Sequence, residues 1–283
     1  CNSVVTVVDT INPVISCTDT TIYLNNSGFI SIDSSFVISS LFDVCGIDSV
    51  HLTNTDFTCT DTGINVITIN VWDFSGNQTS CSALVTVRDT ANPIVSCKDT
   101  LLELSSSGNL TISSNMIMDS VFDVCGIDTV YISKTTFSCS DIGVNQVTLF
   151  VIDNNGNLDS CQANVTVRDN TNPIVNCLDT TIQLSNLGIV SIDTSFILSL
   201  ATDNCGIDSV YLSNSNFNCT NVGNNSVTIY VRDVNGNIDS CSSVVTVVDT
   251  TNPVVSCMDT TIYLDATGNF AIDTSFVLSS ATD

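Results

Sequence analysis

The cysteines of this chain lie on a lattice with one fixed step, and all 14 of them belong to it. They form four series: Cys1, Cys81, Cys161 and Cys241; Cys17, Cys97, Cys177 and Cys257; Cys45, Cys125 and Cys205; and Cys59, Cys139 and Cys219. Self-similarity at one fixed period, here about 80 residues, is the signature of a repeat architecture. The sequence therefore predicts a tandem array of equal modules.

The lattice divides the chain into three complete repeats, at residues 9–88, 89–168 and 169–248. We expect residues 1–8 to finish a preceding repeat and residues 249–283 to begin a further, truncated one. On this interpretation the sequence is a window from a longer array, and a secretion signal or anchor would lie outside it. No apolar run approaches the length that spans a bilayer, so we expect no membrane insertion of this segment.

The density of cysteine indicates an oxidising, extracellular environment. A module of this length has a modest core, and small extracellular domains compensate with disulfides. The alternative is an array of zinc sites, but the sequence has no C-x-x-C pair and only one histidine, His51. Disulfides are therefore the favoured use of these cysteines.

The charge of the chain excludes one class of partner and suggests a ligand. There are 29 acidic residues against 5 basic ones, a net charge of −24, and Glu103 is the only glutamate. Nucleic-acid binding is not expected, because phosphate contacts need lysine and arginine. Short aspartate carboxylates near turns are hard oxygen ligands, which suit Ca²⁺.

Hydrophobic alternation predicts an all-β fold. In the third repeat Val227, Ile229 and Val231 alternate with polar or aromatic residues, which is typical of a half-buried strand. The same pattern recurs at the equivalent positions of the first and second repeats. About seven short strands per repeat, with turn signals every 8–12 residues, predict an immunoglobulin-like β-sandwich.

The chain also resembles a known family. The stretches "DNCGIDSV", "VGNNSVTIYVRDVNGN" and "SCSSVVTVVDTTNPVVSC" of the third repeat are similar to hyalin-repeat (HYR) modules, whereas the first two repeats have "DVCG" in place of "DNCG". The resemblance implies immunoglobulin-like modules of the kind that recur in giant bacterial surface adhesins and extracellular appendages. Identical steps without insertions would then build a rod or a superhelix.

Four cysteines per repeat allow three pairings. In an immunoglobulin-like topology the first and last strands run side by side, which favours joining the cysteine early in one to the cysteine early in the other. The remaining two would then pair across a strand and a turn. The favoured bonds are Cys17–Cys81, Cys45–Cys59, Cys97–Cys161, Cys125–Cys139, Cys177–Cys241 and Cys205–Cys219.

Aspartates at three positions of each repeat are candidate Ca²⁺ ligands. One lies in the linker, one just before the strand that begins "GID" and one in the turn "D-x-[SN]-G-N", and in the assumed topology all three share the entry end of the domain. The alternative is that these residues only cap turns. The predicted ligands, with the carbonyl groups of the turn asparagines, are Asp9, Asp43, Asp73, Asn77, Asp89, Asp123, Asp153, Asn157, Asp169, Asp203, Asp233 and Asn237.

Outward positions of the clear strands vary between repeats while the inward positions stay aliphatic. Several of them are aromatic, which suggests lateral contact with identical chains, glycan binding, or ordinary surface variation. The candidate interface residues are Trp72, Tyr131, Phe150, Tyr211 and Tyr230. No nucleophile–base pair and no phosphate-binding glycine loop can be assembled, so an enzyme and an organic cofactor are not expected.

These observations predict a structural repeat segment on the outside of a cell. It would form the shaft of a bacterial adhesin or filamentous appendage that serves attachment, gliding or capture of cells, with neighbouring repeats and identical chains as partners. The alternative is a repeated adhesive module in which each domain binds a cell-surface glycan or another partner. Binding that strengthens with repeat number would favour the alternative.

Overall fold

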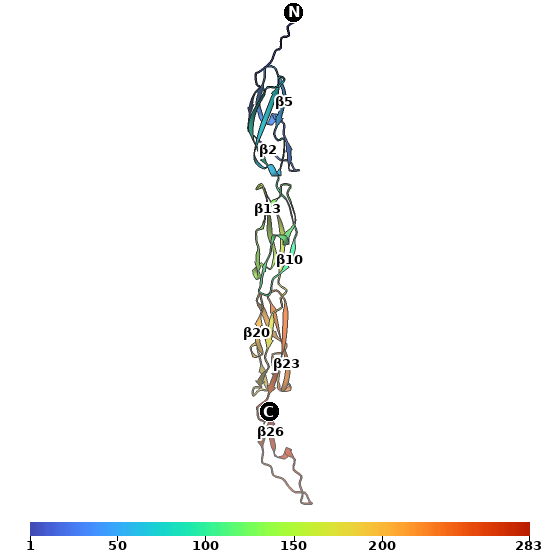
Figure 1. Cartoon of the computed structure of the whole chain (residues 1–283). Helices are drawn as coiled ribbons and strands as arrows, with labels where there is room; N and C mark the ends of the chain where they lie inside the picture. Colours follow the sequence, from blue (N-terminus) through green and yellow to red (C-terminus); the bar gives the residue numbers. More distant parts are fainter. The chain divides into compact units, whose positions relative to one another are not determined.

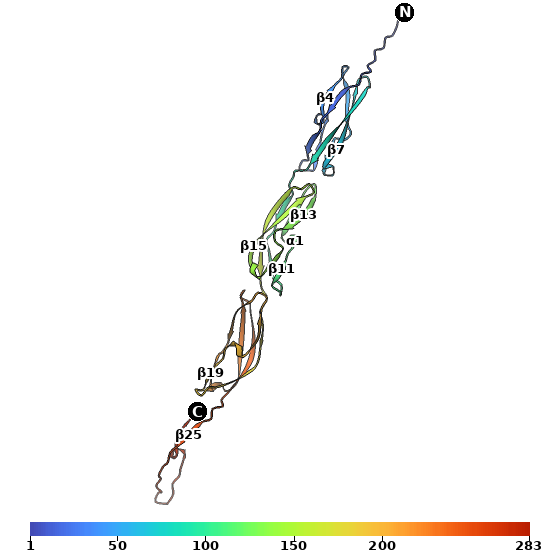
Figure 2. The ribbon, with the colours of Figure 1, turned by 90° about the vertical axis from the view of Figure 1, so that its left-hand side faces the viewer.

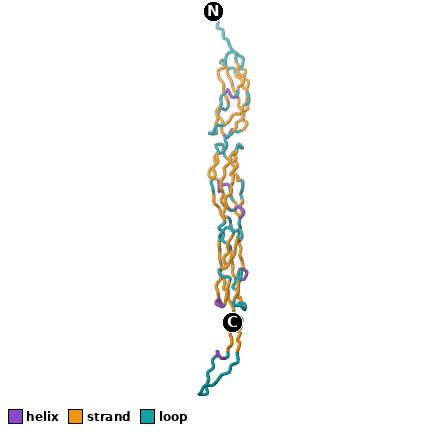
Figure 3. Tube along the Cα trace, turned by 180° about the vertical axis from the view of Figure 1, so that it is seen from behind, coloured by secondary structure: helices purple, strands orange, loops and turns teal.

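The computed structural model describes all residues, 1–283, and divides into two compact units. The first unit consists of residues 1–103 and 109–168, and the second of residues 104–108 and 169–283. Strands dominate each unit, and the few helices are single turns (Figure 3). None of these helices reaches the length or the apolar character that crossing a bilayer demands.

The first repeat contains eight strands and two 3-10 turns. In chain order these are β1 (Val14–Cys17), β2 (Thr20–Tyr23), β3 (Phe29–Ser31), η1 (Ser34–Phe36), β4 (Ile38–Phe42), β5 (Ile47–Leu52), β6 (Asp56–Thr58), η2 (Cys59–Asp61), β7 (Gly63–Asp73) and β8 (Gln78–Arg88).

These strands form the two layers of an immunoglobulin-like sandwich. The larger sheet has the order β2-β8-β7-β5, with β2 parallel to β8 and the other pairs antiparallel. Figure 1 labels its two edge strands, β2 and β5. The other layer consists of the antiparallel pairs β1–β4 and β3–β6. Figure 2 shows β4 and β7 on opposite sides of the first repeat.

The core lies between these layers and follows the alternation of the long strands. Ile67, Ile69 and Val71 of β7 are buried, as are the alternate residues of β8. From the other layer Phe57 of β6 packs into the same cluster and is fully buried. The period of two that the sequence shows therefore places one face of each long strand in the core.

The second repeat has the same elements one lattice step further on, with a single turn of α-helix in place of η1. They are β9 (Ile94–Cys97), β10 (Thr100–Glu103), β11 (Asn109–Thr111), α1 (Ser114–Ile117), β12 (Met118–Phe122), β13 (Ile127–Ile132), β14 (Thr136–Ser138), η3 (Cys139–Asp141), β15 (Gly143–Asp153) and β16 (Leu158–Arg168). The larger sheet has the order β10-β16-β15-β13.

The third repeat again follows this plan, with the sheet order β18-β24-β23-β21. Its elements are β17 (Ile174–Cys177), β18 (Thr180–Gln183), β19 (Ile189–Ser191), η4 (Thr194–Phe196), β20 (Leu198–Thr202), β21 (Ile207–Leu212), β22 (Asn216–Asn218), η5 (Cys219–Asn221), β23 (Gly223–Asp233) and β24 (Ile238–Val248). Beyond it, β25 (Val254–Cys257) and β26 (Leu278–Thr282) form an antiparallel pair, and η6 (Thr274–Phe276) lies between them.

One disulfide closes each complete repeat. Cys17 is bonded to Cys81 with a Cα–Cα distance of 5.9 Å, and this bond joins β1 to β8. The equivalent bonds are Cys97–Cys161 and Cys177–Cys241, each with a Cα–Cα distance of 5.8 Å. Each bond spans 64 residues, so most of a repeat lies inside a covalent loop.

A second disulfide connects two repeats and corrects the pairing expected from the sequence. Cys59 of the first repeat is bonded to Cys125 of the second, with a Cα–Cα distance of 5.1 Å. Cys139, the equivalent of Cys59 in the second repeat, is also in a disulfide. Cys45 and Cys219 carry free, exposed thiols. The predicted bonds Cys45–Cys59, Cys125–Cys139 and Cys205–Cys219 are therefore not formed.

The reason lies in the direction of the strands. Cys45 precedes β5, whose first residue, Ile47, is the partner of Asp73 at the end of β7. Cys59 lies just before Gly63, where β7 begins. The ten steps of β7 span roughly 33 Å, whereas a disulfide needs its Cα atoms within about 7 Å. The two cysteines thus lie at opposite ends of the domain, and no intradomain bond can join them.

Candidate metal centre

Three segments of each repeat meet at its entry end. They are the linker before the first strand, the loop between the fourth and fifth strands, and the turn between the two long strands. In the first repeat they bring together Asp9, Asp43 and Asp73, with one carboxylate oxygen of each within 4.8 Å of the others. The third repeat brings together Asp169, Asp203 and Asp233 within the same limit.

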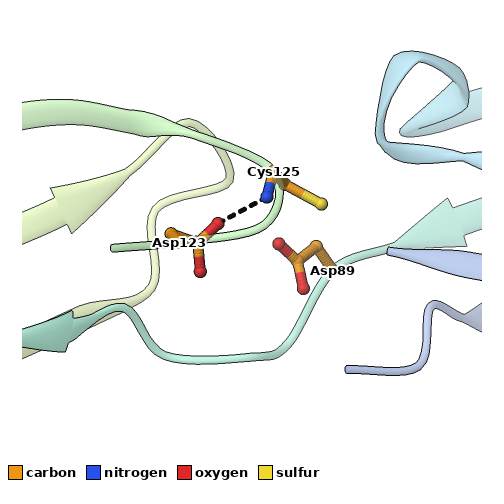
Figure 4. A group of neighbouring side chains, drawn as sticks. All are labelled: Asp89, Asp123 and Cys125. Carbon is orange, nitrogen blue, oxygen red and sulfur yellow. Dashed lines mark hydrogen bonds between the residues drawn. The ribbon is translucent and has the colours of Figure 1, made fainter. Parts of the chain in front are cut away.

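The corresponding group of the second repeat contains Asp89, Asp123 and the sulfur of Cys125 (Figure 4). Asp153, the expected third carboxylate, lies close enough for its charge to act on Asp123. The sulfur of Cys125 is held in the bond to Cys59, so it cannot act as a thiolate ligand. Oxygen atoms are therefore the ligands that this group offers.

The turn aspartate is held by its own loop. Asp73 is 2% exposed, and its Oδ1 accepts hydrogen bonds of 2.8 Å from the backbone N–H groups of Ser75 and Asn77. Gly76 completes the turn with a φ of 86°, which favours glycine. Burial raises the pKa of Asp73, but the hydrogen bonds from Asn77, Ser75 and Gly76 together lower it by more than burial raises it. The net shift of the pKa is therefore downward. The group is therefore held as a carboxylate.

The pKa of the loop aspartate of the second repeat, Asp123, shifts in the opposite direction. The pKa of Asp123 is raised, first by burial and then by the negative charges of Asp89 and Asp153. The N–H groups of Cys125 and Gly126 work against this rise, and the bond from Cys125 measures 2.7 Å. The neighbouring carboxylates thus oppose the ionisation of Asp123.

The turn asparagines lie beside these groups, but it is their amide nitrogen that faces the carboxylates, and this nitrogen cannot bind a metal ion. The Nδ2 of Asn77 donates to Asp73 Oδ2 at 2.7 Å and to the backbone carbonyls of Asp9 and Ile11. Asn157 and Asn237 repeat the contact with their own turn aspartates. Because all of these partners are acceptors, the amide nitrogen must be the atom that faces them. The expectation that asparagine carbonyls coordinate an ion is corrected accordingly: these side chains fasten the turn to the linker.

Several carboxylate oxygens in these groups have no hydrogen-bond partner although they are buried. They are Asp89 Oδ2, Asp169 Oδ2 and Asp203 Oδ1. Figure 4 shows the carboxylate of Asp89 directed toward Asp123, which accepts a hydrogen bond from the backbone N–H of Cys125. Buried polar atoms without a partner are uncommon in proteins and call for a ligand or a water molecule.

A further set of aspartates, which the sequence reasoning did not single out, has a structural role. Asp19, Asp99 and Asp179 follow the first strand of their repeats and accept hydrogen bonds from backbone N–H groups of the last strand, at 2.7–2.8 Å. Their recurrence at the lattice step was the signal that could have revealed them. They show that part of the aspartate lattice serves the fold alone.

The aromatic residues form one pair per repeat on the outer side of the larger sheet. Tyr131 stacks on Phe150 with a centroid distance of 5.0 Å, and Tyr211 stacks on Tyr230 at 5.2 Å. In the first repeat His51 and Trp72 meet edge to face at 5.5 Å. Each pair joins the fifth strand of its repeat to the first long strand.

A known family of domains matches this chain, repeat by repeat. The HYR domain model matches residues 88–167 and residues 168–247, which together make up more than half of the chain. The chain belongs to the HYR domain family. The two matches lie one residue before the repeats that the cysteine lattice defines, and they adjoin without a gap.

Among curated proteins, Hyalin of Strongylocentrotus purpuratus is 29% identical to this chain over 228 residues. The match covers 77% of this chain but 19% of Hyalin, so the chain spans about a fifth of that relative's length. HYR membership therefore applies to the modules, and Hyalin as a whole is a much longer protein.

Solved structures with similar arrangements include the immunoglobulin domains 1–5 of Sidekick-1, at 12% identity and a TM-score of 0.39, covering 85% of this chain and 60% of that one. For Protocadherin gammaB7 EC3-6 the TM-score is 0.32 at 12% identity, and the match covers 90% of this chain and 78% of the protocadherin chain.

Proposed function

We propose that this chain is the shaft of an extracellular adhesin or filamentous appendage, used by a bacterial cell for attachment, gliding or capture of other cells. HYR modules in tandem, and similarity to Hyalin, support an extracellular repeat protein of the adhesion type. The single observation that carries the shaft interpretation is the disulfide between the first and last strands of every complete repeat.

That disulfide gives each module a covalent route for tension. Force that enters the first repeat from its linker reaches Cys17 on β1 and can pass directly to Cys81 on β8. The 64-residue loop between them, which contains most of the core, lies outside this route. A module of this kind transmits load without unfolding its interior, which is what a shaft requires.

The bond between Cys59 and Cys125 adds a second connection between neighbouring repeats. It runs in parallel with the linker that follows β8, so two covalent paths join the first repeat to the second. Independent binding domains need no such bond, because flexible linkers let each domain reach its own ligand. The double connection therefore favours a load-bearing segment over a string of separate binders.

The surface chemistry agrees with this role. The net charge of −24 keeps like chains apart in solution and repels nucleic acids. His51, the only histidine, packs edge to face against Trp72 instead of facing a nucleophile. No general base is placed for catalysis by this contact, which supports a non-enzymatic protein.

Immuno-electron microscopy of the source cells tests the proposal. Antibodies raised against this chain should label surface filaments at regular intervals along their length. A pre-immune serum is the control. Label confined to the filament tips, or to the cell interior, would rule out a shaft.

The aromatic pairs favour a second candidate function, in which every repeat binds a glycan or a protein partner. Tyr131 and Tyr211 remain 45% and 47% exposed while they stack on a neighbour, so each repeat presents an aromatic face to solvent. Aromatic faces of this kind are common in binding surfaces. Chains of one, two and three repeats should then bind a glycan array with increasing avidity, and Tyr131→Ala should weaken that binding. A shaft without this activity should bind nothing in the same assay.

A further inference from the structure

The entry-end carboxylates contain negative charge that the protein itself does not neutralise. Asp169 is 6% exposed; its Oδ1 accepts hydrogen bonds from the backbone of Thr171 and the side chain of Asn204, whereas its Oδ2 has no partner. Asp203 uses one oxygen for the N–H groups of Cys205 and Gly206 and has its other oxygen unpartnered. The two unpartnered oxygens thus belong to neighbouring aspartates of the same entry-end cluster.

The same situation recurs at the junction between the first and second repeats. Asp89 is also 6% exposed and has an unpartnered Oδ2, and its carboxylate faces Asp123 (Figure 4). The hydrogen bond that Asp89 Oδ1 accepts comes from the backbone of Ala91. No hydrogen bond to these carboxylates comes from a lysine or an arginine; the ion pair of this repeat joins Lys134 to Asp141 elsewhere.

Burial of several like charges without a counter-charge is unfavourable, because water no longer screens their repulsion. Proteins resolve this either by protonating one carboxylate or by binding a cation. Protonation of one carboxyl supplies a single O–H donor, which can satisfy one neighbouring oxygen, whereas a cation binds several oxygens at once. The recurrence of the arrangement at the same lattice position favours a cation over a local accident of packing.

The oxygen ligands and their spacing are compatible with Ca²⁺. Two ligands on opposite sides of a Ca²⁺ ion lie up to about 4.8 Å apart, since the ion binds oxygen at about 2.4 Å. The oxygens of Asp169, Asp203 and Asp233 all lie within 4.8 Å of one another. Mg²⁺ demands a nearly ideal octahedron and loses its water ligands reluctantly, so a group of three carboxylates suits it less well than it suits Ca²⁺.

We propose that each entry-end aspartate group binds one Ca²⁺ ion. The linker, loop and turn aspartates supply carboxylate oxygens, and water or backbone carbonyls complete the 6–8 ligands that the ion prefers. This inference goes beyond the proposed function, because the site would bind its ion whether the array is a shaft or a set of binders.

At the junction in the first unit, the ion has a mechanical consequence. Asp89 directly follows β8 of the first repeat, whereas Asp123 lies in the β12–β13 loop of the second. Two residues further on, Cys125 is bonded to Cys59 of the first repeat. Calcium would therefore fasten the linker to the loop that the disulfide already anchors, and the two repeats would lose their freedom to bend against each other.

Isothermal titration of the full chain with CaCl₂ tests the proposal. The expected result is saturable binding of about three ions per chain, one for each group. Asp203→Asn preserves the size and hydrogen bonding of the side chain but removes a charge, so the stoichiometry should fall to about two. Asp208→Asn, at an exposed position five residues further on, is the matched control and should still bind three.

A second variant and a second readout protect the test against misfolding. Asp123→Asn, with the exposed Asp128→Asn as its control, should also lose one ion. Trp72, the only tryptophan, adjoins Asp73 and should sensitise Tb³⁺ luminescence from the first group in all four variants. Calcium should quench that signal by displacement, at concentrations at least tenfold below those at which Mg²⁺ does so.

Three results would overturn the proposal. One is the absence of saturable Ca²⁺ uptake by a chain whose circular dichroism shows an intact β-fold. Another is equal uptake by Asp203→Asn and Asp208→Asn. The third is Mg²⁺ displacing Tb³⁺ as readily as Ca²⁺ does, which would contradict the expected preference for Ca²⁺. Filament labelling of cells is unaffected by any of these results, so the failure of this site and the failure of the shaft proposal can be told apart.

Discussion

The disulfide loops make a quantitative prediction about the response of the chain to force. Each of the three closing bonds spans 64 residues. At ~3.6 Å per extended residue, each loop hides about 230 Å of contour length, and the three together hide about 690 Å. While the bonds are intact, the only chain that can extend between Cys17 and Cys241 is the stretch from Cys81 to Cys97 and that from Cys161 to Cys177, together about 115 Å.

Single-molecule force spectroscopy measures this length directly. The full chain is held through tags at both ends and pulled first without and then with dithiothreitol. We expect the oxidised chain to reach its limit without releasing any loop, and the reduced chain to gain about 690 Å in steps of about 230 Å. Cys45→Ser is a control, because this free thiol belongs to no loop and its removal should change neither result.

The bond between Cys59 and Cys125 does not alter this expectation for the oxidised chain. The route through it, from Cys81 back to Cys59 and from Cys125 back to Cys97, is longer than the direct linker and stays slack. A gain of several hundred ångströms from the oxidised chain would show that tension does not pass through the closing disulfides. The mechanical reasoning behind the shaft proposal would then be wrong.

Three more predictions follow from particular residues. Leu149→Ala removes a fully buried side chain and should destabilise its repeat by about 2–5 kcal/mol in urea unfolding, whereas Leu158→Ala at an exposed position of the same repeat should change stability by less than about 0.5 kcal/mol. Peptide mapping without reduction should recover Cys59 linked to Cys125, and a Cys59 peptide linked to Cys45 would contradict the structure. The hydrogen bonds from the Lys134 side chain and from the backbone N–H of Ser138 lower the pKa of Asp141, so its stabilising effect should be complete above pH ~4 and disappear as the pH falls through the lowered value. The difference in urea midpoint between wild type and Asp141→Asn should therefore shrink from pH 7 to pH 3, and a constant difference would refute this.

Much of the fold could be predicted from the sequence, because it depends on local pattern. The alternation of Ile67, Ile69 and Val71 specifies which face of a strand is buried, and the structure confirms the all-β sandwich that this pattern indicates. Within residues 194–203 the only helical element is the 3-10 turn η4 (Thr194–Phe196). The rest of that stretch is mainly strand β20, because its residues pair with β17.

The convergence of the aspartates at the entry end could be predicted, because it depends on the topology of the sandwich. The orientation of the neighbouring side chains could not. The convergence of Asp9, Asp43 and Asp73 follows once the linker, loop and turn share one end of a sandwich. The direction of the Asn77 amide depends on which acceptors surround it, and nothing in the sequence gives that information.

The disulfide pattern shows the limit most clearly. If each repeat is a closed unit, the sequence predicts that Cys45 and Cys59 pair within one domain. The structure places them at opposite ends of β7, and the partner of Cys59 belongs to the next module. Every free cysteine is one whose partner, at a separation of 64 or 66 residues, would fall outside residues 1–283. The periodicity was therefore sound, and only the assumption of intradomain pairing was wrong.

The bond between Cys59 and Cys125 also has a consequence for survival in an environment rich in proteases. A cut between Cys17 and Cys81, or between Cys97 and Cys161, leaves both fragments joined by the disulfide that closes that loop. A cut in the linker between Cys81 and Cys97 would separate the repeats, except that the Cys59–Cys125 bond still holds them together. From Cys17 to Cys161, no single broken peptide bond can sever the chain, so a protease must cut at least twice to separate the two repeats.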